Sequence, residues 1–86
     1  MHTVIARFHH VTRDPAKIED TLRANGAPDA HVTGYVVAMT FETDSHKEAA
    51  EAARRVLDRS GATRIKVVKR ESGPAASSAL DEFIHA

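Results

Sequence analysis

The sequence predicts a small α+β domain, in which an antiparallel sheet carries two helices on one of its faces. Three observations lead to this prediction. The 86 residues suffice for one hydrophobic core and not for two. Three segments alternate polar and apolar side chains, as half-buried strands do. The two segments between them repeat apolar side chains at helical spacing.

Period-two alternation predicts the strand segments. The first spans residues 3–12 and the last spans residues 64–71. The middle segment, residues 31–42, is interrupted by Gly34, which indicates either a bulge or the tight turn of a hairpin. With a hairpin, the element order becomes β-α-β-β-α-β, the split β-α-β arrangement of a small ferredoxin-like sandwich.

Local end signals predict both helices. A first helix is expected over residues 15–24, because Asp14 is a good N-cap, proline suits the first helical position, and Asn-Gly follows. A second helix is expected over residues 46–60, because Ser45 and Glu48 have the spacing of a capping box and a glycine follows. The helices and one sheet face should bury a common core made of Val37, Met39, Phe41, Leu57 and Ile65.

The chain divides into a single α+β domain over residues 1–71 and a C-terminal part over residues 72–86. The C-terminal part begins with a Ser-Gly-Pro linker and continues as a short amphipathic segment, which could form a helix. Its apolar side consists of Leu80, Phe83 and Ile84. A helix this short is ordered only when it packs on something, either its own domain or another subunit or protein.

Composition excludes several function classes. Lys plus Arg and Asp plus Glu both number 12, so the chain has no overall field that would attract nucleic acid or an anionic membrane. There is no cysteine, which removes disulfides, thiolate catalysis and cysteine-based metal sites. No apolar run is long enough for a membrane span, and no signal peptide is recognisable. We therefore expect a cytoplasmic protein with no membrane partner.

The sheet face opposite the two helices is the main candidate for a binding surface. Alternation places both apolar and basic side chains there: Ile5, Arg7, His9, Val36, Ala38, Lys66, Val68 and Arg70. A bare sheet face is normally polar, so these apolar residues require a cover. The C-terminal segment, a second copy of the chain or a single-stranded nucleic acid could each provide one. The nucleic-acid alternative lacks the aromatic side chains on which RNA-binding sheets stack bases.

Catalytic and metal-binding patterns are weak. The six histidines include no His-x-x-x-His pair on either expected helix, so we expect surface histidines and no metal or cofactor. The letters Asp44-Ser45-His46 resemble a triad, but neighbours at a helix start do not form triad geometry. His9 and Tyr35 are the only nominees for a catalytic site.

These observations favour a non-enzymatic protein-interaction module that self-associates as a homodimer and binds another protein. A bacteriophage or mobile-element accessory protein acting on a host protein would fit the size and the Ala- and Arg-rich composition. The second interpretation is a nucleic-acid-binding module that uses the open sheet face. The third is a small-molecule-binding or catalytic dimer.

Overall fold

The computed structural model describes residues 1–85 and contains four strands and three helices. All neighbouring strands are antiparallel, in the order β2-β3-β1-β4. The elements are, in chain order, β1 (His2–His9), α1 (Pro15–Ala24), β2 (His31–Thr33), β3 (Val36–Phe41), α2 (His46–Arg59), β4 (Thr63–Ser72) and α3 (Ala76–Ile84).

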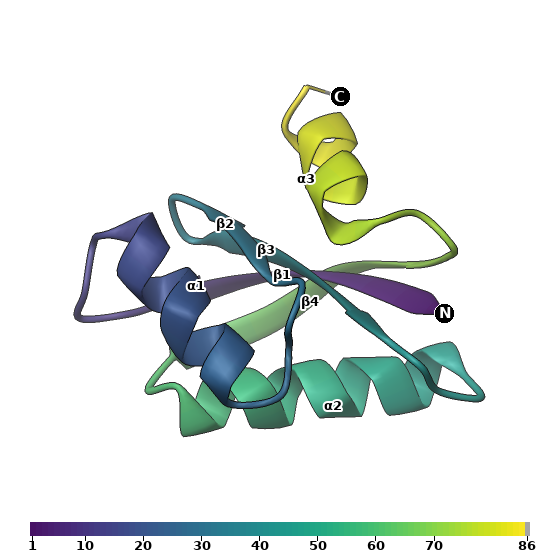
Figure 1. Ribbon diagram of the computed structural model, residues 1–86, viewed down its shortest axis with the longest axis horizontal. Coiled ribbons are helices and arrows are strands. Elements are labelled where there is room, and N and C mark those ends of the chain that lie inside the picture. The colour runs from purple at the N-terminus through teal and green to yellow at the C-terminus, as the bar shows by residue number, and fades with distance from the viewer. Residues whose placement is uncertain (86) are drawn as a thin grey trace.

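The helices lie on both faces of the sheet (Figure 1). Helices α1 and α2 pack on one face, and α3 packs on the other. The predicted α+β class, with an antiparallel sheet and two helices on one face, is confirmed. No helix among residues 1–85 is both long and apolar enough to cross a membrane.

Both helix starts follow their local signals. The Asp14 side chain accepts a hydrogen bond from the Ala16 N–H at 3.0 Å, and proline occupies the first position of α1. The Ser45 hydroxyl accepts a bond from the Glu48 N–H at 3.2 Å and so caps α2. These bonds satisfy N–H groups that the first turn of a helix leaves unpaired.

Gly34 marks a hairpin turn and not a bulge. Gly34 and Tyr35 form a two-residue connection between β2 and β3, and Gly34 has a φ of 58°. Glycine takes a positive φ without steric cost, which suits the first central position of such a turn. Thr33 and Val36 are therefore paired across the hairpin.

Two carboxylates, Glu19 of α1 and Asp29 of the following loop, occupy backbone donors at the β2 edge of the sheet. The Glu19 carboxylate accepts a hydrogen bond from the Val32 N–H at 2.8 Å. Beyond the start of β2, Asp29 accepts from the Thr40 N–H at 3.2 Å. These carboxylates occupy donors that would otherwise be open to another strand, so this edge is closed to strand addition.

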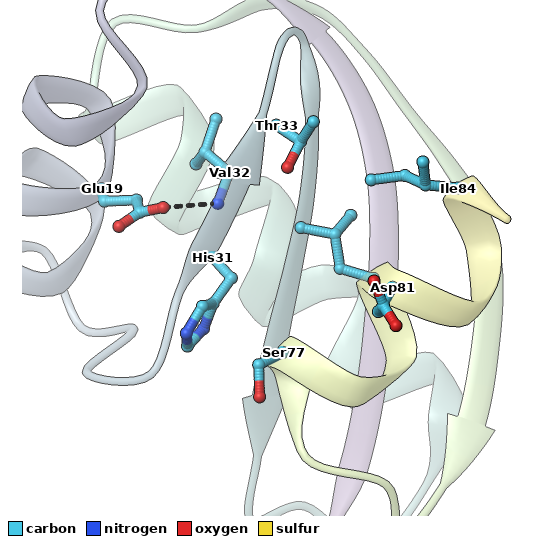
Figure 2. A pocket seen from close by; sticks show the side chains of 8 residues that line it. Glu19, His31, Val32, Thr33, Ser77, Asp81 and Ile84 are labelled. Carbon is cyan, nitrogen blue, oxygen red and sulfur yellow. Dashed lines mark hydrogen bonds between the residues drawn. The ribbon is translucent and has the colours of Figure 1, made fainter.

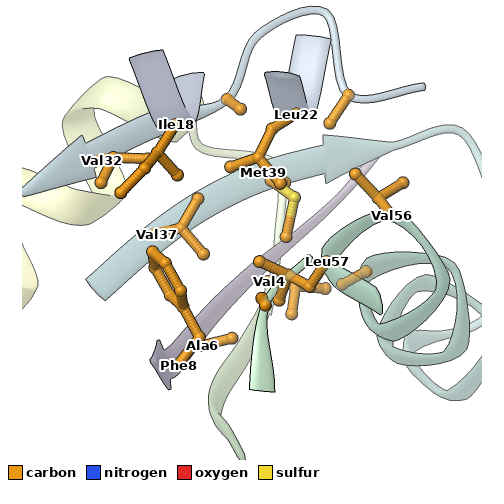
Figure 3. Close-up of a cluster of buried hydrophobic side chains, with 14 of the residues drawn as sticks. Val4, Ala6, Phe8, Ile18, Leu22, Val32, Val37, Met39, Val56 and Leu57 are labelled. Carbon is orange, nitrogen blue, oxygen red and sulfur yellow. The ribbon is translucent and has the colours of Figure 1, made fainter. Parts of the chain in front are cut away.

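The main core lies between the sheet and the helices α1 and α2 (Figure 3). Phe8 is its largest fully buried side chain, and Val37, Met39 and Leu57 are buried with it, as predicted for the last three. Two predicted core residues are only partly buried. They are Phe41, the last residue of β3, and Ile65, near the start of β4 on the sheet edge.

Two bulges shift the pairing of β4 against β1. Ile5 pairs with Lys69 and Ala6 pairs with Val67, so one extra residue of β4, Val68, lies between them. A one-residue slip moves the following side chains to the other face. The second shift lies between Arg7 and His9, opposite the segment that contains Arg64, which has a φ of 52°.

The first bulge corrects the predicted position of Arg70. This residue pairs with Val4, which belongs to the core beneath α1 and α2. Arg70 therefore lies on the face of the sheet that α1 and α2 cover, and not beside Lys66 on the α3 face. Strict alternation failed here because it assumes an unbroken ladder.

Candidate functional site

The sheet face predicted to be open is covered by the chain's own helix α3. Ile5 and Ala38 are fully buried, and they form a second apolar cluster with Ala76, Ala79 and Leu80. Three further predicted site residues are partly buried and pack against this cluster: Val36, Val68 and Phe83. The apolar stripe that motivated self-association is thus closed within one chain.

The linker that precedes α3 is tied to the start of β1. The buried Thr3 hydroxyl donates a hydrogen bond to the Pro74 carbonyl, and the Gly73 N–H donates to the Met1 carbonyl at 3.1 Å. These bonds link residues about seventy positions apart in sequence. They direct the linker over the sheet, so α3 lies on the face to which Ile5 points.

The remaining predicted site residues do not gather in one place. Arg7 and Lys66 pair across β1 and β4, and both are exposed. His9 is exposed at the end of β1. Ile84 is 45% exposed at the end of α3. The predicted binding set therefore separates into a buried apolar group and scattered polar residues.

A hollow of about 190 Å³ lies between β2 and α3 (Figure 2). Ser77, His31 and Asp81 line it, which are the residue types of a catalytic triad. However, His31 and Asp81 each contact a residue outside this set of three. The His31 Nδ1 atom is 2.8 Å from the Asp29 carbonyl, and Asp81 pairs with His85 at 3.3 Å. Among residues 1–85, no hydrogen bond connects the three residues, so the hollow has no assembled nucleophile.

The strongest polar feature is a concentration of positive charge. Residues 54–70 contain seven of the 12 cationic residues and one of the 12 acidic ones, which gives this stretch a formal charge of +6 and the rest of the chain −6. We call these seven exposed cations the cationic edge: Arg54, Arg55, Arg59, Arg64, Lys66, Lys69 and Arg70.

The fold brings the cationic edge together on two neighbouring elements. Helix α2 packs against β4, which is an edge strand of the sheet. Arg54, Arg55, Asp58 and Ile65 line one shared hollow between α2 and β4, the α2–β4 hollow. Lys66 and Lys69 pair with residues of β1 that lie on the α3 side, whereas Arg70 lies on the α2 side. Cations therefore surround the free edge of β4 on both sides.

Little in the chain neutralises this charge. Among residues 1–85, Lys69 is the only member of the cationic edge with an ion-pair partner, Glu71 at 3.5 Å. The large hydrophobic side chains exposed in the described part of the chain are Met1, Val11 and Ile84, and none belongs to the edge. The surface is thus cationic without an apolar centre.

A further hollow, of about 370 Å³, lies where β1 ends and β4 begins, and we call it the terminal hollow. Residues 9–11 form one wall and residues 61–64 form the other. Arg64 lines it and also belongs to the cationic edge, so the two features are continuous. The His9 ring, which borders it, stacks on the Tyr35 ring with centroids 5.5 Å apart.

Strand β1 ends at His9, before residue 12, the predicted end, and the His10 ring that follows is held at both of its nitrogens. The Thr12 N–H donates to its Nδ1 atom at 3.0 Å, so the ring proton resides on Nε2, which donates to the Ser60 carbonyl at 2.8 Å. Both ring nitrogens are thus engaged.

Within residues 1–85, no group of three or more His, Asp or Glu side chains is arranged to hold a metal ion.

Neither the cationic edge nor the terminal hollow was predicted as a site. The charge segregation is visible in the sequence, but the zero net charge conceals it unless charge is summed over windows.

Searches against protein-family models, curated proteins and solved structures found no match.

Proposed function

We propose that the protein is a non-enzymatic module that binds the phosphate backbone of nucleic acid along its cationic edge. The observation that carries this proposal is the segregation of charge, with +6 confined to residues 54–70. Phosphate contacts from Lys and Arg supply most of the affinity in sequence-independent binding. The proposal keeps the nucleic-acid interpretation of the sequence but moves it from the sheet face to the sheet edge.

The chemistry of the edge favours a nucleic acid over an acidic protein. Five of the seven cations are arginines, whose planar guanidinium groups bind phosphates in a forked geometry. A protein interface normally buries an apolar or aromatic centre from which charged residues are depleted. The cationic edge has no such centre, because its only apolar neighbour in the α2–β4 hollow is the half-buried Ile65.

The acidic remainder of the chain would orient the complex. A surface charge of +6 opposed by −6 elsewhere gives the neutral protein an electrostatic dipole. Such a field steers an anionic polymer toward the α2–β4 side and repels it from the other surfaces. Net neutrality therefore does not conflict with nucleic-acid binding, and it limits contact to one side of the molecule.

We also infer a ferredoxin-like arrangement for the first six elements. Their order is β-α-β-β-α-β, and the strand order β2-β3-β1-β4 is compatible with it. Self-association through the sheet face remains a separate proposal. It requires α3 to leave the cluster around Ile5, and a mass measurement in solution tests it.

Charge reversal with a matched control tests the proposed function. Arg55→Glu combined with Lys66→Glu changes two exposed residues of the cationic edge. Lys17→Glu combined with Lys47→Glu makes the same change in net charge at exposed positions elsewhere. Binding of a fluorescent oligonucleotide is measured by anisotropy as salt is raised from about 50 to about 200 mM.

The wild-type protein should lose affinity steeply as salt rises. If the protein contacts five phosphates, a plot of the logarithm of the binding constant against the logarithm of the salt concentration has a slope of about −4.5 on duplex DNA and about −3.5 on a single strand. The edge variant should bind about tenfold or more weakly at low salt and have a slope shallower by about 1.5. The control variant should keep the wild-type slope. Absence of binding at low salt would overturn the proposal, and displacement by polyglutamate at equal charge would assign the edge to acidic proteins instead.

A further inference from the structure

The terminal hollow combines four features that the phosphate contacts do not explain. It borders an exposed aromatic stack, His9 on Tyr35. Its rim carries Val11, a β-branched apolar side chain that is 95% exposed. One wall contains Arg64, a non-glycine residue with a positive φ. Its volume is about 370 Å³.

We infer that this hollow receives an unpaired nucleobase, which stacks on the exposed ring of His9, and that the protein therefore binds single strands in preference to duplexes. This inference rests on the proposed function, because the cationic edge would deliver the strand to the hollow. Single-strand-binding proteins combine a cationic groove along the backbone with aromatic platforms for the bases. Histidine rings and guanidinium planes both serve as such platforms.

The His9 ring is supported as a platform by the Tyr35 ring. Its plane makes an angle of 26° with the Tyr35 ring, which supports it on one side. Tyr35 is itself fixed, because its hydroxyl donates a hydrogen bond to the His10 carbonyl at 3.3 Å and its ring packs on Phe8 with centroids 5.9 Å apart. A preorganised ring loses little conformational entropy when a base stacks on it.

Arg64 connects the base site with the backbone site. Its left-handed backbone conformation is strained for a residue with a Cβ atom, and such strain clusters at functional positions. The guanidinium lies where β4 begins, opposite the end of β1 at which His9 pairs with Thr63. From there it can contact the phosphate next to a base that stacks on His9.

The expected ligand is an unpaired base and not a duplex, because a base inside a duplex is covered by its neighbours. The hollow is formed by two short chain segments at one end of the sheet and does not extend along β4. A duplex could contact the cationic edge but could not place a base in the hollow without unpairing it. The hollow therefore selects for a base that is already unpaired.

The test compares ligands that share phosphates but differ in bases. The probes are a thymidine single strand of about 15 nucleotides, an abasic strand of the same length and a duplex of that length. The wild-type protein should bind the thymidine strand about five- to thirtyfold more tightly than the abasic strand. Tyr35 is the only tyrosine, and tryptophan is absent, so a change in intrinsic fluorescence with the thymidine strand and not with the abasic strand reports a change at the ring that stacks on His9.

Two substitutions of the exposed His9 separate stacking from packing. His9→Leu introduces a side chain of similar size that has no π face, and it should reduce thymidine-strand affinity to that of the abasic strand while leaving the salt slope unchanged. His9→Phe should restore the preference. Equal wild-type affinity for thymidine and abasic strands would overturn the inference and leave the proposed function intact. Loss of salt-dependent binding to every probe would instead overturn the proposed function.

Discussion

Replacing Leu80 by alanine measures how firmly α3 belongs to the folded domain. Leu80 is 5% exposed and packs against Ile5 and Ala38 on the sheet. The substitution removes three carbon groups at about 0.8 kcal/mol each, or about 2.4 kcal/mol of transfer free energy. Leu→Ala changes in cores cost about 2–5 kcal/mol, and a short terminal helix can shift to fill part of the cavity. We expect a loss of about 2–3 kcal/mol.

Urea unfolding followed by circular dichroism provides the measurement. A domain of 86 residues has an expected stability of about 4–13 kcal/mol, so the loss is a large fraction of it. It corresponds to a decrease in Tm of about 10–20 °C. Ile84→Ala is the matched control, because Ile84 belongs to the same helix but is 45% exposed, and it should change stability by about 0.5 kcal/mol or less.

Comparing the free energies of unfolding of the two variants tests whether α3 packs on the sheet. Equal stability of Leu80→Ala and Ile84→Ala would refute the placement of α3 on the sheet. The apolar stripe that contains Ile5 would then need another cover, and a dimer in sedimentation experiments would identify that cover as a second copy. A loss confined to Leu80→Ala supports α3 as the cover.

Three further pairs of substitutions test the fold by denaturation and hydrogen exchange. Phe8→Ala should cost about 3–5 kcal/mol, and Phe41→Ala less than half of that because Phe41 is only partly buried; equal costs would contradict the assigned core. Arg64→Gly should stabilise the protein by about 0.5–1 kcal/mol by removing backbone strain, and Arg64→Ala should not. Glu19→Ala should cost about 1–2 kcal/mol and accelerate exchange of the Val32 amide, whereas Glu19→Gln should retain most of the protection.

The elements with local signals were predicted well from the sequence. Asp14 and Ser45 cap their helices through bonds within the same turn, so nothing distant is needed to place either start. Gly34 left two alternatives open because a bulge and a hairpin both exploit its backbone freedom. The pairing of Thr33 with Val36 resolves them, and that pairing is a property of the assembled sheet.

Features that depend on two distant segments were not predictable in this way. The bulge at Val68 reverses the direction of Arg70, and alternation along one strand carries no sign of it. Helix α3 packs on Ile5 and Ala38, and Thr3 bonds to Pro74, and only the folded chain brings these segments together. The terminal hollow likewise combines the end of β1 with the start of β4, and the sequence placed His9 only in the binding set of the sheet face and, with Tyr35, among the catalytic nominees.

Arg64 links the stability of the fold to its proposed function. A glycine at this position would accommodate the φ of 52° without strain, yet the chain carries an arginine there, at the junction of the cationic edge and the terminal hollow. The guanidinium offers both a phosphate contact and a stacking plane, which glycine cannot supply. Stability and binding should therefore change in opposite directions on Arg64→Gly, as strained functional positions commonly show. An Arg64→Gly protein that is more stable and still binds single strands as tightly as wild type would remove Arg64 from the site and leave the strain without a functional explanation.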